Sequence, residues 1–209
     1  MKYALIVIGL VVVWSLWGFF SSRVEQAQYS IVKKTGDYEI RNYAAHIEAQ
    51  TTVTGEYDTA LKEGFRIIAG YIFGGNVQKQ GIAMTAPVVE RQGDTVQSQK
   101  IAMTAPVRVS DQKDVYTVSF VMPSAYTLES LPTPTDNRVK LVSVSPQKLA
   151  VLRFSWYRTS ARVLRMQNKL MNDLARDGVK TIGRPSYAGY NAPWTPPWLL
   201  RNEVAVQVE

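Results

Sequence analysis

Two methionines at matching positions of a repeated segment carry the most suggestive chemistry in this chain. The heptapeptide Ile-Ala-Met-Thr-Ala-Pro-Val begins at Ile82 and again at Ile101, so Met84 and Met103 occupy the same place in each copy. Two adjacent strands with this sequence would bring two polarizable thioethers together, as in the wall of an apolar ligand pocket. Methionine also fills gaps in ordinary cores, and that alternative stays open.

A single histidine limits the metal and acid–base chemistry open to this chain. His46 is the one histidine among 209 residues, and cysteine is absent. A catalytic triad, a multi-histidine metal site or a thiolate site therefore cannot be assembled from one copy of the chain. The sequence also lacks a phosphate-binding glycine loop and a nucleophile elbow. We expect a binding protein rather than an enzyme.

The net charge of +7 is spread along the chain. A basic balance favours nucleic acid, anionic lipid or an acidic small ligand as the partner. Because the lysines and arginines form no dense cluster, nucleic acid is not expected. Arg158, Arg162, Arg165 and Lys169 follow helical spacing. They form either a solvated helix face or a contact with anionic lipid headgroups.

The N-terminal segment resembles a membrane anchor. Residues 3–20 carry no charge, and this length is close to the minimum for a membrane-crossing helix. Trp14 and other aromatic residues crowd its C-terminal end, as in an aromatic belt. We expect an anchor at residues 1–22, a linker at 23–28 and one domain at 29–209, on the periplasmic or other extracytoplasmic side. A cleaved signal peptide is the alternative, although its apolar region is normally shorter.

The apolar pattern predicts strands and two helices in a repeated order. Leu61, Phe65, Ile68 and Ile72 recur at helical spacing, and a second helix is expected at residues 160–177. The heptapeptides should form a hairpin with a long tip. Further strands are expected at residues 29–33, 38–43, 45–54, 115–122, 138–144, 148–156, 185–190 and 203–208. This order predicts an α+β fold, a distorted antiparallel β-barrel with two helices and two halves related by a pseudo-two-fold axis.

Several segments, in this order, resemble the SOUL haem-binding protein family, and the repeated heptapeptide resembles its bacterial branch. Besides that repeat they are Tyr-Glu-Ile-Arg-Asn-Tyr (38–43), Gly-Tyr-Ile-Phe-Gly-Gly-Asn (70–76), Phe-Val-Met-Pro-Ser (120–124), Tyr-Thr-Leu-Glu-Ser-Leu-Pro (126–132) and Arg-Asn-Glu-Val (201–204). The resemblance implies a distorted β-barrel with two helices that binds haem or another tetrapyrrole in an apolar pocket. It implies no established enzyme activity.

The resemblance also implies candidate ligand contacts. On the first helix, Phe65 would stack on the tetrapyrrole, Ala69 would leave clearance and Lys62 would pair with a propionate. Tyr71 would offer its hydroxyl to iron or a propionate, or anchor the helix. Met84 and Met103 would contact the ring or ligate the iron.

His46 is the candidate axial ligand, or it fills an edge position. Some family members carry a histidine where this chain has Asn42. We expect a protein that sequesters or carries haem, only weakly ligated. The alternatives are a module of the same fold that senses another small molecule, and an enzyme that modifies tetrapyrroles.

Overall fold

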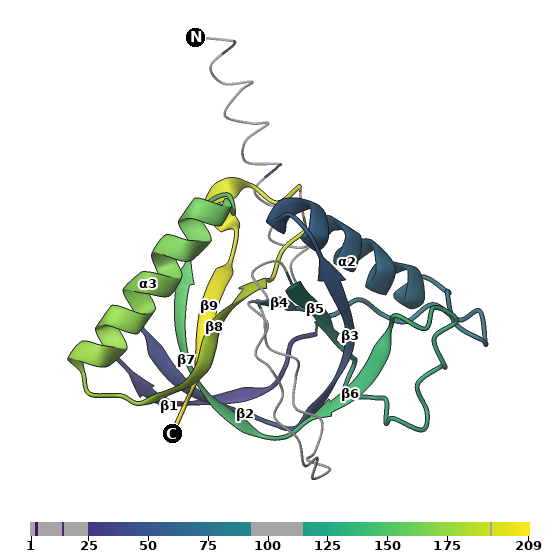
Figure 1. The fold of residues 1–209 in the computed structure, drawn as a ribbon, viewed down its shortest axis with the longest axis horizontal. Coiled ribbons are helices and arrows are strands. Elements are labelled where there is room, and N and C mark those ends of the chain that lie inside the picture. The colour runs from purple at the N-terminus through teal and green to yellow at the C-terminus, as the bar shows by residue number, and fades with distance from the viewer. Residues whose placement is uncertain (1–2, 4–13, 15–24, 93–114, 193) are drawn as a thin grey trace, which may run out of the picture.

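Nine antiparallel strands and two long helices make up the described part of a computed structural model, which comprises Tyr3, Trp14 and residues 25–92, 115–192 and 194–209. The first half contains β1 (Tyr29–Lys34), β2 (Glu39–Tyr43), β3 (His46–Thr54), α2 (Tyr57–Ile72), β4 (Val88–Gln92) and β5 (Val115–Val121). The second half contains β6 (Lys140–Val144), β7 (Gln147–Phe154), α3 (Ser160–Arg176), β8 (Thr181–Gly189), the 3-10 turn η1 (Pro197–Leu199) and β9 (Asn202–Val208). Figure 1 shows a curled sheet with one helix beside each half.

The strand order repeats itself about the centre of the sheet. The order is β1-β2-β7-β9-β8-β4-β5-β3-β6. Outward from the central β8–β4 pair, β9 corresponds to β5, β7 to β3, and β2 to β6. The first strand of each repeated unit, β2 in one half and β6 in the other, therefore pairs with a strand of the opposite half. β2 pairs with β7, and β6 pairs with β3. The sequence pattern predicted the repeated order of elements but not this exchange of strands.

Both helices cover the same face of the sheet. Alternate residues along a strand point to one face. The first core cluster joins α2 to alternate residues of β3 and β5, and the second joins α3 to alternate residues of β7 and β9. Across the sheet, Ala49 pairs with Phe120, Phe120 with Val88, Val88 with Gly189, and Gly189 with Asn202. Paired residues point to the same side, so the two clusters lie on one continuous face of the sheet. The other face carries neither helix, and we call it the helix-free face.

The first helix lies unusually close to the sheet. Leu61, Ile68 and Ile72 are buried on its inner side, as their spacing predicts, whereas Phe65, the fourth residue of that apolar repeat, is partly exposed. Gly64 permits the close approach, since a Cβ at this position would lie 2.6 Å from Cγ2 of Val118. The contact holds the outer face of α2 in a fixed position above β5.

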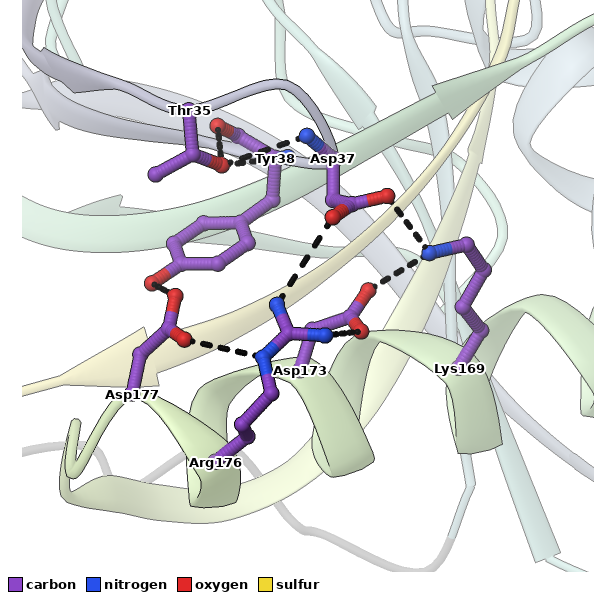
Figure 2. Close-up of polar contacts among 7 residues, drawn as sticks. All are labelled: Thr35, Asp37, Tyr38, Lys169, Asp173, Arg176 and Asp177. Atoms are coloured by element: carbon purple, nitrogen blue, oxygen red, sulfur yellow. Dashed lines mark hydrogen bonds and ion pairs between the residues drawn. The ribbon is translucent and has the colours of Figure 1, made fainter.

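An ion-pair cluster fastens α3 to the turn between β1 and β2. Lys169 donates to Asp37 at 2.9 Å and to Asp173 at 2.7 Å. The hydroxyl of Tyr38 donates to Asp177 at 2.8 Å. Figure 2 shows these side chains converging from the turn and the end of the helix. Lys169, expected on a basic helix face, is therefore engaged within the protein.

The structure confirms the α+β class and corrects two details. Among the described strands, β1 and β6 are the two edges, so the sheet is a half-barrel rather than a closed barrel. The first heptapeptide is an irregular connection from residue 82 to 87, in which Ala86 forms an isolated parallel bridge with Gln26, and β4 begins only at Val88. The second copy, residues 101–107, lies outside the described residues, so its pairing is untested.

The anchor prediction concerns residues that are mostly outside the described ranges. Of residues 1–22, only Tyr3 and Trp14 are described. Within the described part of the chain, no helix combines the length and apolar character that a membrane crossing requires. The anchor therefore stays a prediction.

Candidate ligand-binding site

One face of α2 carries exposed apolar and basic side chains at helical spacing. Lys62, Phe65 and Ala69 recur at intervals of three and four residues, and Phe73 ends the same face. Phe65 and Phe73 are 42% and 71% exposed. Phe65 nevertheless contacts the fully buried Phe120 of β5, with the ring centroids 5.3 Å apart. Its position is therefore fixed while much of the ring stays accessible.

Met84 lies on the segment that crosses from α2 to β4. Two hydrogen bonds fasten this segment: Ile82 N–H donates to the carbonyl of Ile72 at 2.8 Å, and the Thr85 hydroxyl donates to the carbonyl of Val121 on β5. Met84, between these points, is 39% exposed. The segment thus holds the thioether near the C-terminal ends of both α2 and β5. We call the following residues the α2 platform: Lys62, Phe65, Ala69, Phe73 and Met84.

Tyr71 is part of the core beneath this platform. Its side chain is 1% exposed, and its hydroxyl donates to the carbonyl of Pro132 at 2.9 Å. Burial raises the pKa of Tyr71 to about 12, so the phenol stays neutral at physiological pH. The hydroxyl anchors α2 to the loop that follows β5.

His46 begins β3 on the helix-free face, away from the platform. Its Nδ1 lies 2.9 Å from the carbonyl of Ala44, and its Nε2 lies 3.3 Å from the carboxylate of Glu48. Burial lowers the pKa of His46, but the hydrogen bonds to Glu48 and Ala44 outweigh it and leave that pKa above its ordinary value. Both partners are acceptors, so both ring nitrogens donate when the imidazole is protonated. In this arrangement neither nitrogen offers a lone pair to a metal.

Glu48 organises a buried charge cluster that sequence reasoning missed. Its carboxylate accepts two hydrogen bonds from Arg91, at 3.0 and 3.1 Å, and one from Gln50 at 2.8 Å. Burial alone would raise the pKa of Glu48, but Arg91 and His46 hold it far below its ordinary range. Arg91 lies on β4, distant in sequence, so the pairing leaves no local sequence signal.

A second buried charge cluster lies on the helix-free face near the other half. Glu203 of β9 accepts hydrogen bonds from Arg41 at 3.0 Å, Arg201 at 2.9 Å and the hydroxyl of Tyr190 at 2.7 Å. Burial and the neighbouring Glu203 carboxylate raise the pKa of Tyr190. The helix-free face therefore holds buried charge clusters around both Glu48 and Glu203.

A pocket of about 480 Å³ nevertheless opens beside His46 on that face. Apolar side chains such as Leu128 and Val144 line it, together with residues 25–28. This volume falls within the range of small-molecule sites. It is therefore a second place where a ligand could bind.

A smaller cleft of about 190 Å³ lies between the starts of α2 and α3, with Glu90 among its lining residues. Glu90 accepts hydrogen bonds from Arg158 at 2.9 and 3.1 Å and from the hydroxyl of Tyr57 at 3.1 Å. Burial raises the pKa of Glu90 to about 7 although Arg158 opposes the change. Arg158, expected on an exposed basic face, is therefore an internal partner.

The structure places the predicted site residues in separate regions. The platform contains four of them, His46 lies on the helix-free face, and Tyr71 lies in the core. Met103 falls outside the described residues. Within the described ranges, no cluster of His, Cys, Asp and Glu side chains could hold a metal ion.

Comparison with known proteins identifies a family that matches most of the chain. The model described as SOUL heme-binding protein matches residues 24–96 and 91–207. A mouse protein named heme-binding protein 2 is 25% identical over 193 residues, which cover 87% of each chain. A Xenopus laevis protein named heme-binding protein 1 is 28% identical over 172 residues, covering 80% of this chain and 81% of the relative.

Solved structures with much lower identity share the fold. The C-terminal domain of EcmrR superposes with a TM-score of 0.57 at 12% identity, covering 87% of this chain and 98% of that domain. A hydrolase from Listeria innocua gives a TM-score of 0.51 at 11% identity, covering 85% of this chain and 94% of the hydrolase. At such identities the likeness extends to the fold alone.

Proposed function

Because the chain belongs to the SOUL heme-binding protein family, we propose that it binds haem or a related tetrapyrrole and sequesters or carries it. The named vertebrate relatives support the ligand class at low identity. The absence of a catalytic signature from the sequence favours binding over turnover.

The α2 platform is the ligand surface that we favour. We favour it because the ring of Phe65 is partly exposed and is held in place by its contact with Phe120. A flat tetrapyrrole stacks well on a fixed aromatic ring. Lys62 has no ion-pair partner within the described part of the chain and is exposed, so its ammonium is free to bind a propionate.

These residues fit the ring and its carboxylates better than they fit iron. The thioether of Met84 is accessible, and thioethers ligate haem iron in some proteins. Both nitrogens of His46 are engaged, and this residue lies on the other face of the sheet. We therefore propose that binding is mainly apolar and that axial ligation is weak or absent.

The pocket beside His46 is the alternative location. Its volume of about 480 Å³ and apolar lining suit a small ligand. Binding there would require Glu48 to release His46 before the imidazole could ligate iron. This extra step is the reason that we place it second.

Haemin titration with matched variants tests the proposal and separates the two locations. Wild type should give a Soret shift and saturable quenching of tryptophan fluorescence. Phe65→Ala and Lys62→Glu should each weaken binding about tenfold, equivalent to about 1.4 kcal/mol. Lys33→Glu, which changes an exposed lysine on β1, is the control and should bind as wild type does.

Two other results would redirect or overturn this conclusion. Loss of binding in His46→Ala, with Phe65→Ala unaffected, would move the site to the pocket. Flat difference spectra for the wild type would refute haem binding altogether. Native mass spectrometry of protein purified without added haem would then reveal whether another small molecule occupies the fold.

A further inference from the structure

Exposed apolar side chains gather where β7 passes into α3 and where η1 lies. We call them the tryptophan patch; with their exposed fractions they are Trp156 (48%), Tyr157 (53%), Leu164 (57%), Trp194 (59%) and Trp198 (44%). Figure 1 shows the η1 loop at the upper edge of the molecule, beside the upper end of α3. Large exposed apolar side chains that gather in one region mark a candidate interaction site.

Hydrogen bonds and a constrained backbone fix the position of Trp156 in the patch. Trp156 N–H donates to the carbonyl of Pro197 at 3.0 Å, and the Asn202 side chain donates to the carbonyl of Trp156 at 2.9 Å. Trp156 also has a φ of 80°, in the left-handed region. Such a conformation costs about 1–3 kcal/mol for a non-glycine residue and persists only where its surroundings impose it. The surrounding fold therefore fixes the backbone that presents Trp156 at the surface.

The patch also contacts the uncharged N-terminal segment. The indole N–H of Trp14 donates to the carbonyl of Trp194 at 2.9 Å. Its ring meets Trp198 edge to face, with centroids 5.5 Å apart and planes at 77°. Trp14 belongs to residues 3–20, which the sequence predicts to be membrane-embedded. The predicted anchor and the patch therefore meet at one place.

The charges beside the patch have the sign that anionic lipid requires. Arg165 follows Leu164 directly in the first turns of α3, and Arg162 lies one turn before Arg165 on the same side of the helix. Neither has an ion-pair partner within the described ranges, whereas Arg158 and Lys169 are engaged by Glu90, Asp37 and Asp173. Of the basic face predicted along α3, Arg162 and Arg165 therefore stay without an ion-pair partner in the described residues.

We propose that the tryptophan patch docks on an anionic phospholipid bilayer, so that the domain lies on the membrane surface in a fixed orientation. Tryptophan and tyrosine rings favour the headgroup level, and Leu164 would reach the acyl boundary. Arg162 and Arg165 would contact lipid phosphates. The patch is separate from the α2 platform, so this proposal is independent of haem binding.

The lack of cysteine makes a direct test possible, because a single introduced cysteine can be labelled selectively. The full chain would carry Leu164→Cys with an environment-sensitive fluorophore, in nanodiscs of phosphatidylcholine with or without phosphatidylglycerol. Ile182→Cys is the matched control, since Ile182 is 48% exposed and lies at the opposite end of β8 from Gly189, whose partner Asn202 contacts Trp156. Lipids with a nitroxide on the acyl chain then report the depth of each label.

Docking predicts strong nitroxide quenching at Leu164→Cys, weak quenching at Ile182→Cys, and an increase at the first position when phosphatidylglycerol is present. Arg162→Glu with Arg165→Glu should abolish that increase. Equally weak quenching at both positions would mean that the patch does not contact the bilayer, and would overturn the proposal. A label at Leu164→Cys that is shielded in detergent without lipid would indicate a second copy of the chain on the patch, and would overturn it too.

Discussion

Replacing Arg91 by alanine should destabilise the protein far more than removing a surface arginine. The change leaves the buried Glu48 carboxylate, 1% exposed, without the guanidinium that donates to it at 3.0 and 3.1 Å. Removing one partner of a buried ion pair costs about 3–5 kcal/mol. Arg91 itself is 23% exposed, and Gln50 and His46 still donate to Glu48, so we expect the lower limit, about 3 kcal/mol.

Urea denaturation followed by circular dichroism measures this loss. With a slope of about 2 kcal/mol per molar urea, a loss of about 3 kcal/mol lowers the midpoint by about 1.5 M. Arg138→Ala is the control, because Arg138 is 51% exposed in its pair with Asp136. Because solvent screens an exposed pair of this kind, its loss should move the midpoint much less.

The pH dependence provides an independent check. The pKa of Glu48 lies below its ordinary value of 4.5, so its ion pair stabilises the fold above that pH and loses this effect as the pH falls through the folded-state pKa. The difference between wild type and Arg91→Ala should therefore shrink in acid. If Arg91→Ala and Arg138→Ala had the same midpoint at neutral pH, the reasoning would be refuted.

Three further predictions follow from the site. The pKa of His46 is raised above 6.5, so its bond to Glu48 stabilises the fold fully below that pH and is lost as the pH rises through the folded-state value; NMR titration of the imidazole should find the higher pKa. Tyr71→Phe should cost about 1–2 kcal/mol in urea, since the carbonyl of Pro132 loses its donor, and an unchanged haemin affinity would identify an anchor rather than a ligand contact. Gly64→Ala should lower the melting temperature despite the better helix propensity of alanine, because overpacking against Val118 costs about 1–3 kcal/mol; a rise would contradict the close contact.

Periodicity predicted the parts of this protein that depend on neighbours in sequence. Leu61, Ile68 and Ile72 form the buried side of α2 because the helical repeat places them there. The same repeat places Lys62, Phe65 and Ala69 on one outer face, so most of the platform could be anticipated.

Contacts between distant segments could not be anticipated in this way. The bond from Tyr71 to Pro132 and the pairing of Glu48 with Arg91 join residues far apart in sequence, and no local pattern records them. The heptapeptide also has strand-like composition up to Pro87, yet it crosses from helix to sheet before β4 begins at Val88. Its anchors at Ile72 and Val121 lie on other elements, so tertiary contacts decided its conformation.

The exchanged strands make the two halves dependent on each other. Since β2 completes the sheet beside β7 and β6 completes it beside β3, a chain severed between β5 and β6 leaves each fragment with an unpaired strand edge and a displaced first strand. The arrangement within one chain is that of a domain-swapped dimer joined by a linker. Unfolding should accordingly be one cooperative event, and a half released by proteolysis would be prone to recruit the missing strand from another molecule.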